Sequence, residues 1–597
     1  MTLANPRFVA QDDRSTPPNL PPPSSPRMMV SAKHAALSAA GLAVFLASSP
    51  LPGLAQEDPG GFAITNQNLI ENCQRCHTVD DEDRMSRISY LRKTPEGWQT
   101  SIRRMVALHN VRVSPAEARE IVRYLADRQG IAPEELRPAL FEVERRPIDH
   151  DYQGDSGVEF TCIQCHSMGR VMTQRRTKEE WGLLLATHRG LYPLSDRFSF
   201  RRRGPAPTRP GPDGSRPDTR HPMDKAIDHL SSVFPLETAE WSAWSATMRP
   251  PRLAGTWALS GYEPGKGPIY GTVTIAAGSD GSTFTSSATY VYAESGDKVE
   301  SSGQALVYTG YQWRGRSNPG TDSELREVML VERNQGEMSG RWFTGAYDEI
   351  GPDVRLQRVG SAALLTGVFP NAVARGEPVE VRVFGGGLTT GSVADLDFGS
   401  GVTVVSVSDP NNGALRVRLT VADDAQIGAR DLFAFGTLLE GALIVHDGVD
   451  RITVTPETGM ARIGGANFPK GYQTYEAIGF NDGPDGKPET DDDLGLGRVD
   501  VSWSVEEYAT TFGDDDVNFI GSMGHDGTFV PAIDGPNPDR VGDRNNIGDV
   551  WVVATHETRE GEQLRARAHL LVTVPLYMRW EPWRDWGSPP NTQEVSR

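Results

Sequence analysis

The chain has 597 residues, of which 38% are hydrophobic and 23% are charged, and its formal net charge is -19. This length predicts several domains, each long enough to bury a core of its own. Apart from one short apolar run near the N-terminus, no stretch approaches the roughly 20 apolar residues that cross a membrane. The acidic charge disfavours nucleic acid as a partner, because a phosphate backbone is bound through Lys and Arg side chains.

Residues 1–55 have the features of an export signal preceded by an extension. Lys33 precedes an apolar run over residues 35–47, and Ala55 ends a stretch of small residues. A basic start, a short apolar centre and a small-residue exit are typical of a secretory signal peptide. We expect cleavage after Ala55 and a mature protein in the bacterial periplasm. A translation start at Met28 or Met29 would give a signal of ordinary length.

The chain holds four cysteines, and all of them lie in two Cys-x-x-Cys-His motifs. The motifs run from Cys73 through Cys76 to His77 and from Cys162 through Cys165 to His166. This is the attachment motif of c-type haem, in which two thiols bond the porphyrin and the next imidazole binds the iron. Zinc sites and redox dithiols also use cysteine pairs. Two motifs that use every cysteine behind an export signal favour two covalently bound haem c groups.

An internal repeat after each motif offers a sixth ligand for each iron. Seven residues separate Trp98 from Met105 in the first copy and Trp181 from His188 in the second. Seven residues are two helical turns, so each Trp shares a helix face with its candidate ligand. The predicted iron ligands are therefore His77 and Met105 on haem one, and His166 and His188 on haem two.

Other ligands stay open. His109 is the alternative on the first iron, and His221, Met223 and Met248 are the alternatives on the second. Methionine ligation raises the reduction potential relative to a second histidine. The ligand types therefore predict that electrons enter at the second haem and leave from the first.

The repeat also predicts the helices around these ligands. Thr94 and Thr177 are the expected N-caps of the two ligand helices. A helix over residues 114–125 is expected to close the first unit, and a helix over residues 235–248 is expected to close the second. Between the second ligand helix and that closing helix lies an Arg-, Pro- and Gly-rich insertion, over residues 195–222.

From about residue 250 the pattern changes to short alternating runs separated by Gly, Asp and Asn turns, which is typical of strands. The predicted fold class is a mostly helical dihaem cytochrome c domain followed by three antiparallel β domains. The predicted domains are 56–250 for the haems, 251–358 for a barrel-like domain, 359–450 for an immunoglobulin-like sandwich and 451–597 for a further β-sandwich. The chain contains neither a nucleophile elbow nor a phosphate-binding lysine loop. We therefore expect no catalytic residue in this chain.

Two acidic stretches lie in the last predicted domain. Between Asn481 and Asp493, side-chain oxygens alternate with glycines, a composition that can hold calcium, although the spacing is not that of an EF-hand. A solvated turn is the competing interpretation. The run from Asp514 to Asp516 is predicted to be ordinary surface.

With two Cys-x-x-Cys-His motifs, the paired helices that place a ligand seven residues after Trp, and three trailing β domains, the chain resembles the α subunit of quinohemoprotein amine dehydrogenase. The resemblance implies a periplasmic αβγ heterotrimer that oxidatively deaminates primary amines. It implies a small γ subunit carrying cysteine tryptophylquinone, a β-propeller β subunit, and an external cytochrome c or blue copper protein. The role implied for this chain is electron transfer from the quinone to that acceptor.

Two functions of other classes stay open. One is a stand-alone periplasmic dihaem electron carrier whose β domains bind a surface or a polysaccharide. The other is a dihaem peroxidase, which requires one iron with an open or displaceable sixth position. With all four cysteines assigned to haem, this chain cannot itself carry the cysteine-derived quinone.

Overall fold

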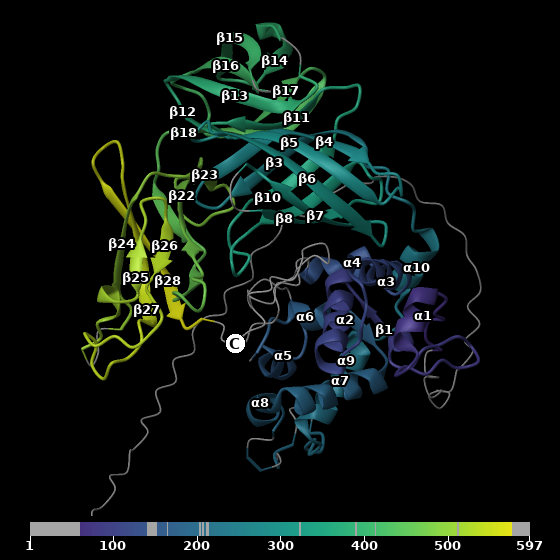
Figure 1. Ribbon diagram of the computed structural model, residues 1–597. Helices are drawn as coiled ribbons and strands as arrows, with labels where there is room; N and C mark the ends of the chain where they lie inside the picture. The colour runs from purple at the N-terminus through teal and green to yellow at the C-terminus, as the bar shows by residue number, and fades with distance from the viewer. Residues whose placement is uncertain are drawn as a thin grey trace, which may run out of the picture. The chain divides into compact units, whose positions relative to one another are not determined.

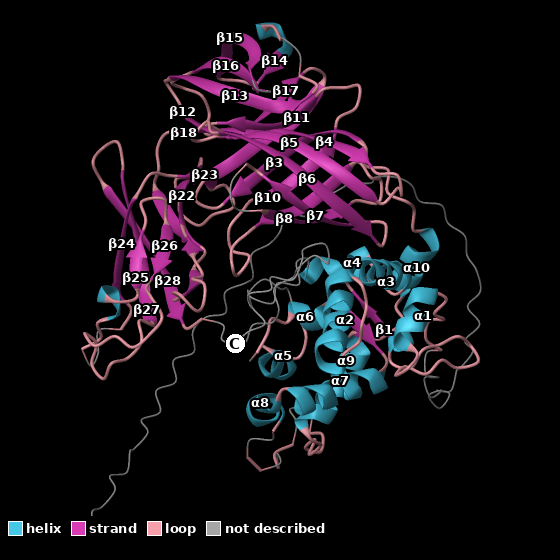
Figure 2. Ribbon diagram, in the orientation of Figure 1, coloured by secondary structure: helices cyan, strands magenta, loops and turns pink. Residues whose placement is uncertain are grey.

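The computed structural model of the chain describes residues 60–575, apart from 140–151, 164, 202–203, 206–207, 211–213, 321–323, 389–390, 412–413 and 510–512. All of these residues belong to one compact unit, Asp58–Arg597. The predicted signal segment, 1–55, lies outside the described residues. Described α-helices are confined to residues 67–247, and strands dominate from residue 255 onward (Figures 1 and 2). The predicted fold class, helical first and antiparallel β afterwards, is confirmed.

The helical domain consists of short helices and two three-residue strands. Its elements are α1 Gln67–Cys73, η1 Ile88–Tyr90, β1 Leu91–Lys93, α2 Pro95–His109, α3 Pro115–Arg128, α4 Pro133–Leu136, η2 Arg137–Ala139, α5 Ser156–Cys162, α6 Gly169–Met172, β2 Gln174–Arg176, α7 Lys178–Leu191, α8 Pro193–Ser195, η3 Asp196–Phe200, α9 Pro222–Val233 and α10 Ala239–Thr247. Within the described part of the chain, none of the helices has the length and apolarity needed to cross a membrane.

Side-chain caps fix where the two ligand helices begin. The Thr94 hydroxyl accepts a hydrogen bond from the backbone N–H of Gly97, and the Thr177 hydroxyl accepts one from Glu180. These bonds satisfy N–H groups that the first helical turn leaves without an intrahelical partner. Both predicted N-caps are confirmed, which fixes the rotation of α2 and α7 relative to the strands before them.

The closing helix of the second unit is not the predicted one. The indole N–H of Trp98 donates to the carbonyl of Gln129, just after α3, at 3.3 Å. The equivalent Trp181 donates to the carbonyl of Phe234, just after α9, at 3.2 Å. Helix α9 is therefore the counterpart of α3. The prediction for residues 235–248 was wrong, because α10 buries its tryptophans in the core of the next domain.

The first β domain is a closed barrel in which eight strands pair antiparallel in the order β10-β3-β4-β5-β6-β7-β8-β9. The strands are β3 Gly255–Glu263, β4 Gly267–Ala277, β5 Thr283–Tyr292, β6 Lys298–Tyr308, β7 Gln312–Asn318, β8 Leu325–Val331, β9 Glu337–Phe343 and β10 Asp353–Arg358. Pairing of β10 with both β3 and β9 closes the ring, so that the described barrel strands leave no edge exposed.

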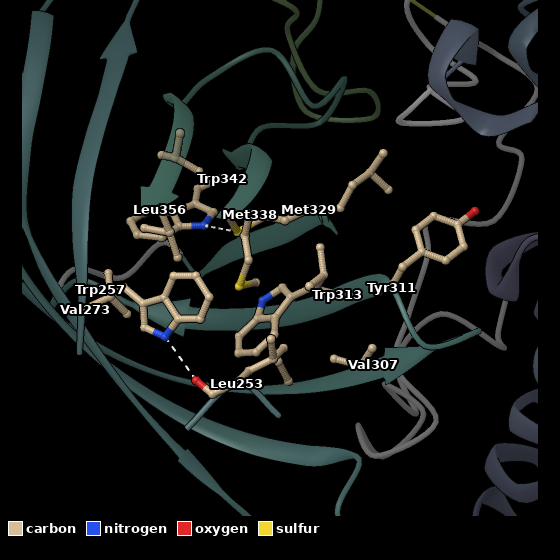
Figure 3. Close-up of a cluster of buried hydrophobic side chains, with 14 of the residues drawn as sticks. Leu253, Trp257, Val273, Val307, Tyr311, Trp313, Met329, Met338, Trp342 and Leu356 are labelled. Carbon is tan, nitrogen blue, oxygen red and sulfur yellow. Dashed lines mark hydrogen bonds between the residues drawn. The ribbon is translucent and has the colours of Figure 1, made fainter. Parts of the chain in front are cut away.

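Large side chains fill the interior of the barrel. Trp257, Trp313 and Trp342 point inward and are almost fully buried (Figure 3). Each indole N–H has an acceptor: the carbonyl of Leu253, the carboxylate of Glu327 and the Met329 sulfur, respectively. Eight strands enclose a space that side chains can just fill. The barrel therefore has a packed core.

The two remaining domains are β-sandwiches. The first packs the sheet β11-β13-β16-β15 against β12-β18-β17-β14, and the second combines β19-β22-β23, β20-β28-β27-β24 and β21-β26-β25. The first contains β11 Leu364–Phe369, β12 Ala372–Ala374, β13 Pro378–Gly386, η4 Val393–Asp395, β14 Leu396–Asp397, β15 Val402–Asn411, β16 Ala414–Val421, β17 Gly428–Ala434 and β18 Thr437–His446. The second contains β19 Arg451–Thr455, β20 Thr458–Arg462, β21 Gln473–Thr474, β22 Glu476–Asn481, β23 Leu494–Arg498, β24 Ser502–Glu507, η5 Asp516–Asn518, β25 Gly521–Met523, β26 Thr528–Pro531, β27 Gly548–Glu557 and β28 Gln563–Thr573. Most pairs are antiparallel, but β12 pairs parallel with β18 and β20 with β28.

The acidic run at residues 514–516 differs from the expected ordinary surface. Asp516 is buried, and its carboxylate pairs with the guanidinium of Arg540, whose side chain is fully buried. Asp515 also pairs with Arg540, at 3.1 Å. A buried cation requires a nearby anion, so the run is an ion-pair cluster rather than solvated surface. The sequence alone could not show this, because Arg540 lies 24 residues downstream of Asp516.

The other acidic segment, 481–493, forms hydrogen-bonded turns. Asp485 accepts from the backbone N–H of Lys487 at 2.8 Å, and the Thr490 hydroxyl donates to Asp492 at 2.8 Å. Asp482 pairs with Arg451 at 3.3 Å. These contacts agree with the solvated-turn interpretation, and calcium binding here stays a prediction.

Candidate haem sites

The first Cys-x-x-Cys-His motif begins on the last residue of α1. The backbone N–H groups of Cys76 and His77 donate to the carbonyl of Cys73, at 3.1 and 3.0 Å, so the motif wraps the end of the helix. Burial, with a smaller contribution from Cys76, raises the pKa of the Cys73 thiol to about 11. A reactive dithiol needs a lowered thiol pKa. This environment therefore does not favour a redox dithiol.

The second motif repeats this arrangement on α5. The helix starts at the N-cap Asp155, whose side chain accepts from the N–H of Val158, and ends at Cys162. Burial raises the pKa of the Cys162 thiol to about 12 and also raises that of Cys165. Both cysteine pairs are thus presented in the same way, at the end of a seven-residue helix.

Backbone carbonyls orient the three predicted histidine ligands. The Nδ1 atom of His77 lies 2.8 Å from the carbonyl of Ser86, and that of His166 lies 2.8 Å from the carbonyl of Ser167. The Nδ1 atom of His188 lies 2.9 Å from the carbonyl of its own helix at Leu184. A carbonyl can only accept, so Nδ1 carries the proton and Nε2 keeps its lone pair. This is the usual orientation of a metal-binding histidine.

The structure brings His166 and His188 together. Their ring centres lie 6.4 Å apart, and the rings are tilted by 48°. Two imidazoles bound to one metal through nitrogens about 2 Å from it have ring centres about 6 Å apart. Burial, with the charge of Arg170, lowers the pKa of His166 to about 4, so the ring is neutral and able to bind a metal. Tyr192 and Phe200 pack around the His188 ring, at centroid distances of 6.1 and 5.9 Å.

A cavity of 340 Å³ adjoins this pair of histidines. It is lined by the cysteines and the histidine of the second motif, by His188, and by apolar side chains from α6, α7 and α9; the apolar lining includes Val171, Trp181, Leu184, Leu185 and Leu230. An apolar cavity with a few converging polar groups is typical of a cofactor site. Two thiols, two imidazoles and an apolar wall are the groups that a c-type haem requires, so the residues present fit that group.

The alternative ligands for the second haem lie elsewhere. His221 is the N-cap of α9, and its Nδ1 accepts from the backbone N–H of Met223 at 3.2 Å. Met248 lies where a side chain on Gly310, in the turn between β6 and β7, would meet it. Among the described residues that line the cavity, His188 is present and these three alternatives are not.

Met105 lies half-buried on α2, in the first unit. Its backbone carbonyl accepts from the N–H of Asn110, the left-handed residue that ends the helix. His109 occupies the last, exposed turn of the same helix. The pairing of Met105 with His77 rests on the sequence repeat, so it stays a prediction.

The two haem units are related by a local two-fold arrangement. Strands β1 and β2 pair antiparallel, and the central pair joins Arg92 to Arg175, its equivalent in the repeat. The flanking pairs follow the same symmetry. Leu91 faces Arg176 and Lys93 faces Gln174, and each of these pairs is the repeat equivalent of the other. The repeat therefore places the two units back to back on a shared two-stranded sheet.

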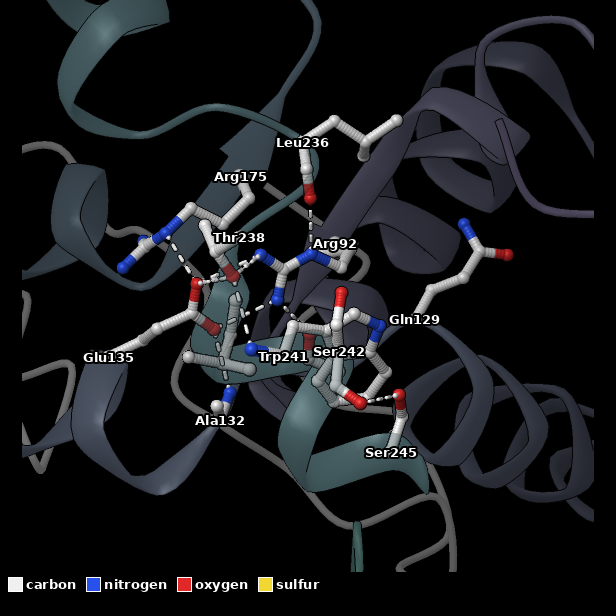
Figure 4. Close-up of polar contacts among 12 residues, drawn as sticks. Arg92, Gln129, Ala132, Glu135, Arg175, Leu236, Thr238, Trp241, Ser242 and Ser245 are labelled. Atoms are coloured by element: carbon white, nitrogen blue, oxygen red, sulfur yellow. Dashed lines mark hydrogen bonds and ion pairs between the residues drawn. The ribbon is translucent and has the colours of Figure 1, made fainter. Parts of the chain in front are cut away.

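A buried ionic cluster lies on this axis, and the sequence analysis missed it. The carboxylate of Glu135 accepts from both terminal nitrogens of Arg92, at 2.8 Å each, and from Arg175 at 3.1 Å (Figure 4). The three side chains are at most 6% exposed. Burial alone would raise the pKa of Glu135, but hydrogen bonds and charge from the two guanidinium groups lower it to about 2. The only sequence signal was the arginine at equivalent positions of the two repeats.

Family models match each domain of the chain in turn. The model described as quinohemoprotein amine dehydrogenase A, alpha subunit, haem binding, matches residues 64–203. Models of domains II, III and IV of the same alpha subunit match residues 250–359, 362–447 and 452–583. The chain belongs to the quinohemoprotein amine dehydrogenase alpha subunit family. Haem binding by the helical domain of this amine dehydrogenase subunit is thereby supported, in agreement with the fit of the second cavity.

Other comparisons add little. No curated protein matches the chain. A redesigned β-barrel is 14% identical over 19% of this chain and 98% of its own, with a TM-score of 0.17. The SGBP-B protein of the Bacteroides ovatus mixed-linkage glucan utilization locus, solved with a mixed-linkage heptasaccharide, is 11% identical over 54% of this chain and 61% of its own, with a TM-score of 0.18. At these TM-scores neither likeness carries an argument.

Proposed function

We propose that this chain is the dihaem c electron-transfer subunit of a periplasmic quinohemoprotein amine dehydrogenase. Electrons would arrive from the cysteine tryptophylquinone of a small γ subunit, after oxidative deamination of a primary amine. They would leave to an external cytochrome c or blue copper protein. The observation that carries the proposal is the placement of His166 and His188 6.4 Å apart, beside a cavity that also exposes Cys162 and Cys165.

The residues of the second unit have separate tasks. Cys162 and Cys165 would hold the porphyrin covalently, and His166 and His188 would bind its iron. A haem iron held in this way takes up and releases one electron at a time. The apolar wall of the cavity keeps water from the iron. Because both ligands are held by backbone carbonyls, little rearrangement would accompany a change of charge.

In the first unit, Cys73 and Cys76 would hold the other haem, with His77 and Met105 on its iron. Methionine ligation gives a higher potential than two histidines. We therefore propose that electrons enter at the second haem and leave from the first. The β-rich remainder would serve as the docking surface for a β-propeller subunit and the γ subunit.

One feature of the site disfavours the peroxidase alternative. A peroxidase needs one iron with an open or displaceable sixth position. At the second site His188 already faces His166, and at the first the sequence repeat predicts Met105 as the sixth ligand. The stand-alone carrier differs from the proposal in its partners. Isolation of the native assembly distinguishes the stand-alone carrier from the amine dehydrogenase subunit.

The proposal is tested on the assembly purified from the native periplasm. We expect a small quinone-positive subunit and a second haem-free subunit to co-purify with this chain. Addition of a primary amine should then produce the absorption bands of reduced haem. A chain that purifies alone, and whose haem spectrum does not respond to amines, would overturn the proposal in favour of the stand-alone carrier.

A further inference from the structure

One wall of the second haem cavity is built by the first unit. Helix α2, which carries Met105, contributes four of the lining residues: Gly97, Thr100, Ser101 and Arg104. Their spacing places them on a single face of the helix. Trp98 and Ile102, on another face, pack in the core of the first unit. Arg104 of α2 therefore lines the second candidate site, whereas the next residue, Met105, is the predicted ligand of the first.

The lining of this cavity is cationic. It includes Lys93, Arg104, Arg170 and Arg176, and the described lining residues include no Asp or Glu. Three of these four cations are guanidinium groups, and all four line the same cavity as His188.

The four cations reach the cavity from both units. The ammonium of Lys93 donates to the Ser101 hydroxyl at 2.6 Å and lies over the Trp98 ring. Arg176 donates to the side-chain carbonyl of Gln174, at 2.7 and 2.9 Å. Arg104 is on α2 of the first unit and Arg170 is on α6 of the second, so these two guanidinium groups line the cavity from separate units.

A haem brings two propionate carboxylates into the protein. A carboxylate removed from water needs a cation or several hydrogen-bond donors, and guanidinium groups bind carboxylates through paired hydrogen bonds. We propose that Arg104 and Arg170 bind the propionates of the second haem, so that helix α2 of the first unit completes the haem site of the second. The inference rests on the proposed function, because it requires a haem on Cys162 and Cys165.

The test is the midpoint potential of each haem in the intact, haem-loaded protein, measured by spectroscopic redox titration. Removing a positive charge beside the second haem favours its oxidised iron, so Arg104→Gln should lower the potential of that haem. We expect about a tenfold shift of its redox equilibrium, which is about 59 mV for one electron. Arg170→Gln should act in the same direction, and Arg104→Lys should restore most of the potential.

Arg103→Gln is the matched control. It removes the same charge from the same helix one residue away, and Arg103 is not among the described residues that line the cavity. We expect Arg103→Gln to leave the midpoint potential of the second haem unchanged. With two haems bound, two results would overturn this inference and leave the proposed function intact. One is an equal shift of the second haem's potential in Arg103→Gln and Arg104→Gln; the other is no shift in Arg104→Gln. A wild-type chain with no haem on the second motif would overturn the proposed function and this inference together.

Discussion

The backbone carbonyl that holds each histidine decides which nitrogen is offered to a metal. In His188 the acceptor is the carbonyl one turn earlier in α7, so the helix itself orients the ring. Residue 188 also lies in the lining of the second cavity. We therefore expect another ligand side chain at this position to reach the same site.

Substituting the ligand should change the second haem and leave its attachment intact. We expect His188→Met to keep both haems, because the thioether bonds do not involve this residue, and to raise the potential of the second haem. Redox titration followed by absorption spectroscopy measures both. His221→Met is the control, since His221 caps α9 and should leave the potential unchanged. A shift in His221→Met without one in His188→Met would show that the ligand had been assigned to the wrong residue.

At the scale of elements, the junction of β1, β2 and α4 depends on one carboxylate. Glu135 forms ion pairs with both Arg92 and Arg175, which meet at the centre of the two-stranded sheet. Removing one partner of a buried ionic cluster leaves charge without compensation, which costs about 3–5 kcal/mol. We therefore expect Glu135→Gln to reduce the free energy of unfolding by about that amount at pH 7. Chemical denaturation followed by tryptophan fluorescence measures it.

The same carboxylate gives this contribution a pH dependence. The folded pKa of Glu135, about 2, lies below the usual value near 4.5. Its stabilising effect is therefore complete above pH 4.5 and is lost as the pH falls towards 2. The difference between wild type and Glu135→Gln should shrink over that range. Glu134→Gln, at the exposed neighbouring position, should show no such difference. A wild-type advantage that stays constant from pH 7 to pH 2 would contradict this account of Glu135.

How far the sequence could predict these elements depended on how local their signals are. The N-caps Thr94 and Thr177 were predictable, because a cap acts within one helical turn. The closing helix of the second unit was not. A helix that buries Trp241 and Trp244 needs an apolar partner. The residues around the helix do not indicate that this partner is the barrel core. The Glu135 cluster was missed for the same reason, since its members are 40 and 43 residues apart.

At the scale of the whole molecule, the barrel supports helix α2, which lines the second candidate haem site. Glu96, in the first turn of α2, forms a buried ion pair with Arg314 of β7. The Tyr311 hydroxyl donates to the carbonyl of Ile131 at 2.8 Å, and the Trp244 indole donates to the carbonyl of Thr309 at 3.0 Å. The β domain adjacent to the haem domain thus holds the first turn of α2, the segment before α4, and α10.

The central claim is that this chain carries two covalently bound haems, one in each half of the repeat. The most direct measurement is the intact mass of the purified mature chain under denaturing conditions, with and without substitution of each cysteine pair. We predict a mass that includes two haems, and the loss of one haem in each of Cys73→Ala/Cys76→Ala and Cys162→Ala/Cys165→Ala. Only the second double variant should lose the absorption of the haem whose potential shifts in His188→Met. A wild-type mass without added haem, or with cysteines joined as disulfides, would contradict the account.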